Sequence, residues 1–183
     1  MPVVLIVTII LVLIAFGIVF LVTYSKLLKL NTLVNNSWTE ISFQLKRRSE
    51  LIPKLNDIIK KKTKNQNNLV ETFADVEKKM IGSRTISTTM EADKEFTEAF
   101  SYLIMISESN PKLKNDTAFQ RLMSDFLDVE EKLQIARRSY NIYAEKNNEK
   151  LSSFPSNFIN SFIGHFQIRK YYELEKSKAR KKK

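Results

Sequence analysis

The side chains in this chain that could carry out chemistry are one histidine and a set of carboxylates. The chain has no cysteine, which excludes a disulfide framework, a zinc–cysteine site and a thiol nucleophile. His165 has no second histidine to join it in a zinc site and no cysteine to form a nucleophile–base pair. We therefore expect His165 to be a surface or packing residue.

Carboxylates are the remaining candidates for catalysis or metal binding. Asp128, Glu130 and Glu131 lie on one expected helix, and Glu71 and Asp75 lie on another. A di-iron helical bundle would also need Glu-x-x-His pairs, which the sequence lacks. It also lacks a glycine-rich phosphate loop with GKS or GKT. We interpret these carboxylates as solvated helix faces and expect no catalytic residue, no metal, no cofactor and no enzymatic activity.

The elements that carry these side chains are predicted to be helices. Gly17, Gly82 and Gly164 are the only glycines, and the chain has four prolines. Because hairpins and short strands need frequent turn residues, this composition favours long helices.

The first helix is predicted to cross a membrane. An uncharged run begins at Val3 and ends at Thr23, followed by Tyr24 at the position of an aromatic belt. At about 1.5 Å per residue the run would be ~31 Å long, which matches a hydrocarbon core of about 30 Å. A cleaved signal peptide would have a basic start, a shorter core and a small-x-small cleavage site. We expect an uncleaved anchor.

The orientation of the anchor follows from its flanking charges. Lys26 and Lys29 follow the run, and no lysine or arginine precedes it. This pattern favours an N-terminus outside the cell membrane and a following domain in the cytoplasm.

Apolar residues recur at steps of three and four from Leu27 to Ile59, which is typical of an amphipathic helix. Arg48 interrupts this series. Pro53 is expected to break or kink the helix, because proline removes a backbone hydrogen bond and clashes with the preceding turn. A second helix would then begin with Pro53 at its first position and stop near Gly82.

Two more helices are predicted after a loop at SRTISTT. The third covers roughly residues 90–109, and Asn115 or Asp116 caps a long fourth helix whose apolar stripe reaches Leu151. The predicted fold class is all-α: an N-terminal transmembrane helix followed by an antiparallel up-and-down four-helix bundle.

Trp38, Arg47 and Arg48 are candidate interface or packing residues. Trp38 is expected to pack in the core or between helices, with a binding pocket as the alternative. The basic groups KRR (46–48), KKKTK (60–64) and Arg137–Arg138 are expected to be solvated faces. Contact with an anionic partner is the alternative for these groups.

Four phenylalanines recur at every fourth position: Phe154, Phe158, Phe162 and Phe166. An up-and-down bundle of four helices would return this segment, which includes Pro155, to the membrane side. The segment either plugs the open end of the bundle, which we favour, or lies among the lipid headgroups as an interfacial helix.

The last 15 residues form a basic tail with eight basic and two acidic side chains. Placed beside a membrane, such a tail would bind anionic lipid. The candidate lipid-contacting residues are Lys176, Lys178, Arg180, Lys181, Lys182 and Lys183.

Three blocks of the sequence resemble the LemA family. SWTEISFQLKRRSELIPKL (37–55) is similar to the family's tryptophan before QLKRR…LIPNL, although Lys54 replaces an amide. NPKLKND…VEEKLQIARRSYN (110–141) is similar to a second family block, and LSSFPSNFI (151–159) resembles its SFPSN signature. The segment FINSFIGHFQIRKYYE and the lysine tail depart from the family pattern.

The resemblance implies a membrane-anchored, up-and-down bundle of four helices in the bacterial envelope without a settled molecular activity. We expect three domains: an anchor (1–24), a LemA-like bundle (25–168) and a basic tail (169–183). The expected function is a non-catalytic scaffold that binds an unknown protein partner, with homo-oligomers left open. The alternative is a membrane-tethered enzyme that uses carboxylates or a bound metal. Nucleic-acid binding is not expected, because no recognised motif for it occurs.

Overall fold

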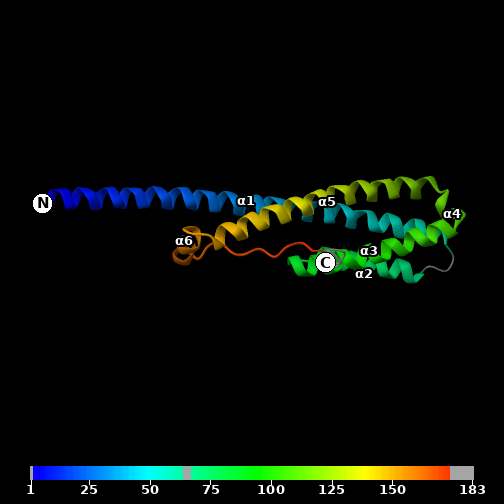
Figure 1. The fold of residues 1–183 in the computed structure, drawn as a ribbon. Coiled ribbons are helices and arrows are strands. Elements are labelled where there is room, and N and C mark those ends of the chain that lie inside the picture. Colours follow the sequence, from blue (N-terminus) through cyan, green and yellow to red (C-terminus); the bar gives the residue numbers. More distant parts are fainter. Residues whose placement is uncertain (1, 64–66, 174–183) are drawn as a thin grey trace, which may run out of the picture. The chain divides into compact units, whose positions relative to one another are not determined.

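The computed structural model describes residues 2–63 and 67–173, so the predicted lipid-contacting tail residues 176–183 lie outside the described residues. Within those two ranges the chain forms helices and no strands, which confirms the all-α class (Figure 1). The helices in chain order are α1 (Pro2–Lys62), α2 (Asn67–Gly82), α3 (Ile86–Ser109), α4 (Pro111–Lys114), α5 (Thr117–Ser152) and α6 (Ser156–Ile163).

The chain divides into two compact units. The first unit contains the described residues of 1–37 and 139–171, and the second contains those of 38–138 together with 172–173. The two long helices α1 and α5 therefore supply residues to both units. The predicted division into anchor, bundle and tail stays a prediction.

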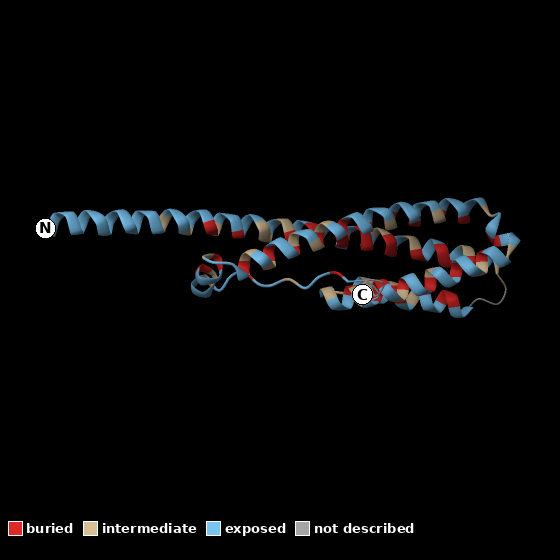
Figure 2. Cartoon of the chain, in the orientation of Figure 1, coloured by how far each residue is buried: buried red, intermediate tan, exposed pale blue. Residues whose placement is uncertain are grey.

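The uncharged run of α1 belongs to the first unit, and its side chains are exposed along nearly the whole run (Figure 2). By length and composition α1 can cross a membrane. Beyond the run, Leu27 is buried together with Leu151 and Phe166, and the ring of Tyr24 lies 5.8 Å from that of Phe166. This small cluster fixes residues near the end of α5 and after α6 to α1.

The second unit has an apolar core to which α1, α2, α3, α4 and α5 all contribute. Helices α2 and α3 pack against each other. The ring centres of Phe73 and Phe96 lie 6.0 Å apart. Phe96 also lies 5.7 Å from Phe126 of α5. The buried members of this core are Ile52, Leu55, Ile59, Leu69, Val70, Phe73, Val76, Phe96, Ala99, Leu103, Leu113, Phe119, Leu122 and Phe126.

Helix α1 continues through Pro53, so the predicted start of a new helix at this residue is wrong, and the alternative of a kink stays a prediction. Pro53 is exposed, whereas Ile52 and Leu55 beside it are fully buried in the core. Burial of apolar residues on both sides of the proline offsets the loss of one backbone hydrogen bond. The second helix begins at Asn67 instead.

Of the other predicted helix ends, the start of the third helix differs from the structure by a few residues and the rest agree. Helix α3 begins at Ile86, within the stretch predicted as a loop, because Thr85 and Thr88 form a reciprocal capping box. The predicted cap of the long helix is present at Asp116, whose side chain accepts a hydrogen bond of 2.9 Å from the Phe119 N–H. Helix α2 ends at Gly82, as predicted.

Candidate functional site

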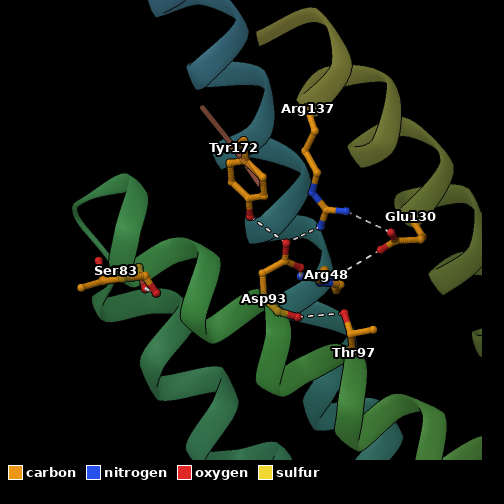
Figure 3. A network of polar contacts seen from close by, with 8 residues as sticks. Arg48, Ser83, Asp93, Thr97, Glu130, Arg137 and Tyr172 are labelled. Atoms are coloured by element: carbon orange, nitrogen blue, oxygen red, sulfur yellow. Dashed lines mark hydrogen bonds and ion pairs between the residues drawn. The ribbon is translucent and has the colours of Figure 1, made fainter. Parts of the chain in front are cut away.

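A buried cluster of charged side chains lies in the second unit, centred on Asp93 of α3 (Figure 3). Arg48 of α1 pairs with one carboxylate oxygen of Asp93, and Arg137 of α5 pairs with the other at 2.5 Å. The hydroxyl of Tyr172, in the segment after α6, donates a 2.7 Å hydrogen bond to the same Asp93 oxygen as Arg137. Glu130 of α5 accepts from both guanidinium groups, at 3.1 Å from Arg48 and 3.2 Å from Arg137.

Aromatic rings cover both guanidinium groups of this cluster. The guanidinium carbon of Arg48 lies 4.1 Å from the centre of the Phe96 ring, and that of Arg137 lies 5.3 Å from the centre of the Tyr172 ring. The ring of Trp38 lies 6.4 Å from that of Tyr172. Ring faces carry negative charge density, so these contacts stabilise the positive charges of the two guanidinium groups.

The cluster balances its own charge, because two guanidinium groups face two carboxylates. Burial, followed by the negative charge of Asp93, raises the pKa of the Tyr172 hydroxyl far above its ordinary value. The hydroxyl therefore stays protonated and remains a hydrogen-bond donor. Among the described residues, the Nε atoms of Arg48 and Arg137 are buried without a hydrogen-bond partner.

The arrangement of this cluster suits a structural role, in which its ion pairs hold helices together. Asp93 is 0% exposed and Arg48 is 1% exposed, so neither side chain can meet a molecule in solution. Both Asp93 oxygens already accept hydrogen bonds from charged or hydroxyl donors. A buried pair of this kind is costly to break by removing one partner, and its fixed geometry ties three helices together.

Sequence reasoning misplaced two members of the cluster and did not single out two others. Arg48 and Arg137 were expected on solvated faces, and this is wrong because both side chains are buried. Asp93 and Tyr172 were not proposed as site residues. The signal was present in the helical spacing: Arg48 interrupts the apolar stripe of α1, and Asp93 lies one turn before Phe96 on the stripe of α3.

The other candidate polar residues are more exposed. Trp38 is half-buried against Tyr172, and Arg47 makes a long 3.5 Å ion pair with Asp128. The pKa of Asp128 is lowered by its hydrogen bond with Lys132 and by nearby positive charge.

The remaining catalytic candidates of the sequence show no grouping. Glu131, Glu71 and Asp75 are exposed, and His165 is exposed beside the Phe166 ring. Within residues 2–63 and 67–173, no three acidic or histidine side chains come together as a metal site would require.

An extended strap, defined here as residues 164–171, lies in the first unit after α6. Asn148 of α5 binds both backbone groups of Arg169, accepting from its N–H and donating to its carbonyl, each at 2.8 Å. Asn160 of α6 holds Phe166 in the same reciprocal way at 3.1 Å. The Tyr140 hydroxyl donates to the carbonyl of Lys170 at 2.9 Å. Side-chain amides thus supply the hydrogen bonds that a neighbouring strand would supply in a sheet.

The four periodic phenylalanines do not share one environment. Phe166 is buried, whereas Phe154, Phe158 and Phe162 are 82%, 49% and 75% exposed. Gly164 ends α6 in the left-handed region (φ 63°), which reverses the chain direction and lets Phe166 fold inward.

Comparison with known proteins gives one clear result. No curated protein matches the sequence. The family model described as the LemA family matches residues 37–183. This range includes the whole second unit and residues 139–171 of the first unit. That match spans far more than half of the chain and contains Arg48, Asp93 and the phenylalanine segment. The chain belongs to the LemA family.

Proposed function

We propose that this chain is a membrane-anchored helical scaffold of the bacterial envelope that binds another protein and has no catalytic activity. The observation that carries the proposal is the exposed uncharged run of α1, which continues as the same helix into the core of the second unit. Membership of the LemA family supports association with the envelope membrane.

We further propose that α1, α2, α3 and α5 form an antiparallel up-and-down bundle on the cytoplasmic side. All four helices supply residues to one core, which supports the bundle. Lys26 and Lys29 after the uncharged run support the orientation, since cytoplasmic flanks carry an excess of basic residues.

The burial of the charged cluster and the exposure of apolar side chains favour protein binding over catalysis. The buried carboxylate of Asp93 is saturated by its own partners and closed to solvent. Large apolar side chains are instead exposed on the helices of the second unit, including Met105 of α3 and Leu127 and Ile135 of α5. We take these exposed apolar side chains as the candidate contact points for a protein partner.

Orientation can be tested with one introduced thiol, because the chain has no cysteine. Ser109 is exposed at the end of α3, so Ser109→Cys gives an accessible probe. A membrane-impermeant maleimide should leave this variant unlabelled in intact cells and should label it after lysis. Labelling of intact cells would place the domain outside and refute the proposed orientation.

The anchor and the binding surface need separate tests. The full chain should stay in the membrane pellet after alkaline carbonate extraction, and a chain without residues 2–24 should be released.

A photo-crosslinking amino acid at Leu127 or Ile135 should give discrete protein adducts in cells, with exposed Asp125 as the control position. Adducts at none of the exposed apolar positions would contradict the scaffold proposal.

A further inference from the structure

An apolar pocket in the first unit has one wall from the uncharged run of α1 and another from the segment around α6. Both walls belong to the same compact unit, so their placement beside each other is a property of that unit. The lining residues are Phe16, Val19, Phe20, Phe154, Pro155, Phe158 and Ile159.

The position of Phe16 and Phe20 in the uncharged run of α1 gives the depth at which this pocket would lie in a membrane. Phe20 and Phe16 lie three and seven residues before Thr23, where the uncharged run ends. At about 1.5 Å per residue they lie about 5–10 Å inside that end. Amphipathic helices that lie in a membrane interface reach a depth of about 5–10 Å. A segment packed beside Phe16 and Phe20 therefore lies at the depth of an interfacial helix.

The two sides of α6 differ in burial. Ser156 and Ile159 are buried, whereas Phe158 and Phe162 are exposed. The ring centres of Phe158 and Phe162 lie 4.9 Å apart. The ring of Phe154, just before α6, is exposed as well. Three neighbouring exposed rings are unfavourable in water, and soluble proteins rarely leave such a group uncovered.

Several polar side chains of this segment have hydrogen-bond partners in or just after it, whereas the buried Ser156 hydroxyl has none among the described residues. The Ser161 hydroxyl donates to the Phe158 carbonyl at 2.6 Å, and the Asn157 side chain accepts from the Phe158 N–H at 2.7 Å. Asn160 is engaged with the backbone of Phe166. Near hydrocarbon, where water is scarce, polar groups must be satisfied internally in this way.

Charge is arranged to match the edge of a membrane. Residues 151–164 carry no charged side chain, Lys150 precedes them and the exposed Lys170 follows, while the guanidinium of Arg169 is held by Asn31 and Asn35. Basic residues that flank an uncharged aromatic stretch are suited to anionic headgroups.

We propose that α6 is an interfacial membrane helix and that Phe154, Phe158 and Phe162 insert among lipid acyl chains beside α1. This inference rests on the proposed membrane anchor. The occupant is lipid because the exposed rings are continuous with Phe16, Val19 and Phe20 of the uncharged run, which would itself face lipid. The interfacial placement replaces the plug interpretation for these three rings, and Phe166 alone folds inward.

The test uses the full chain in vesicles of phosphatidylcholine and phosphatidylglycerol. Trp38 is the only tryptophan, so a Trp38→Phe background allows one reporter at a time. Phe162→Trp reports on α6, and Phe16→Trp reports on the anchor. Ile81→Trp is the matched control, because Ile81 is an exposed apolar residue of the second unit. Quenching is measured with lipids brominated near the carbonyl end or near the methyl end of the acyl chain.

Phe162→Trp should be quenched several-fold more strongly than Ile81→Trp, and more by the lipid brominated near the carbonyl end. Quenching of Phe16→Trp without quenching of Phe162→Trp overturns the interfacial helix and leaves the anchor intact. Blue-shifted but unquenched emission from Phe162→Trp also overturns it, since protein such as a second copy would then cover the rings. An unquenched Phe16→Trp overturns the anchor itself.

A second reporter guards against misfolding of the Trp38→Phe background. Phe162→Cys in the otherwise unchanged chain can be labelled at a single thiol with an environment-sensitive fluorophore. Quenching of that fluorophore by lipids spin-labelled on the acyl chain supports the inference, and quenching no greater than for Ile81→Cys overturns it.

Discussion

The hydroxyl of Tyr172 donates a 2.7 Å hydrogen bond to the carboxylate of Asp93, a residue 79 positions earlier in the chain. Both side chains are buried, and Asp93 also binds the guanidinium groups of Arg48 and Arg137. The residue that follows the strap is thereby fixed to the centre of the second unit.

Tyr172→Phe should destabilise the folded chain while keeping the ring that packs on Trp38. A buried hydrogen bond to a charged group contributes about 1.5–3 kcal/mol, so a loss of this size in the free energy of unfolding is expected. Denaturant titration of the full chain in detergent measures it. Tyr171→Phe is the control, because Tyr171 is exposed. Equal effects of the two substitutions would show that the Asp93 contact contributes nothing.

Stability should fall at alkaline pH through the same hydroxyl. Burial and the charge of Asp93 raise the pKa of Tyr172 far above its ordinary value of 10.0. The unfolded chain therefore loses this proton at a lower pH than the folded chain, and the stabilisation is present below pH 10 and lost above it.

The effect can be isolated by comparing the wild type with Tyr172→Phe, which shares all other titrating groups. Above pH 10, the stability difference between them should shrink by up to about 1.4 kcal/mol per pH unit. Melting temperatures measured across the alkaline range test this. A difference that stays constant with pH would contradict it.

Arg47 and Arg48 are neighbours that should respond differently to the same substitution. Arg48→Met leaves Asp93 and Glu130 without one cation in a buried site, so a loss of about 3–5 kcal/mol is expected. Arg47 makes only a partly exposed pair with Asp128, so Arg47→Met should cost less than about 1 kcal/mol.

A milder variant keeps this comparison measurable if Arg48→Met does not fold. Arg48→Lys retains one charge but cannot bond both carboxylates through a planar fork, so its stability should fall between that of Arg48→Met and the wild type. Urea or thermal unfolding gives the order. Wild-type stability in Arg48→Lys would show that the bridging geometry is unimportant.

Asn148→Leu should loosen the strap without disturbing the core of the second unit. The substitution removes both hydrogen bonds to the backbone of Arg169. Backbone amides of the strap should then exchange hydrogen faster, and trypsin should cut sooner after Arg169 and Lys170. Glu149→Gln, an exposed neighbouring change, should leave both rates unchanged. Unaltered exchange in Asn148→Leu would mean that other contacts hold the strap.

Local spacing made the helices predictable, and the burial of charge was harder to foresee. The stripe from Leu27 to Ile59 identified the buried face of α1, and Asp116 was recognised as a cap. At Pro53, tertiary burial of the flanking residues prevailed over the local preference of proline to end a helix. That outcome depends on the packing partner and cannot be read from the helix alone.

The charged cluster could be predicted only in part, because its logic depends on three helices at once. Arg48 looked like a defect in one stripe, and its meaning requires Asp93 and Glu130 on two other helices. Spacing in one helix cannot show which charges in another will face it. The period of four likewise identified the phenylalanines but not the inward turn at Gly164 that separates Phe166 from the others.

The asparagine contacts of the strap have a consequence for engineering. Asn148 and Asn160 recognise peptide groups, which every residue except proline provides, and not the side chains of the strap. The exposed positions Gln167 and Ile168 can therefore be replaced by other residues. A short epitope or protease recognition sequence placed there would be displayed in an extended form that antibodies and proteases read, on a chain otherwise built of helices.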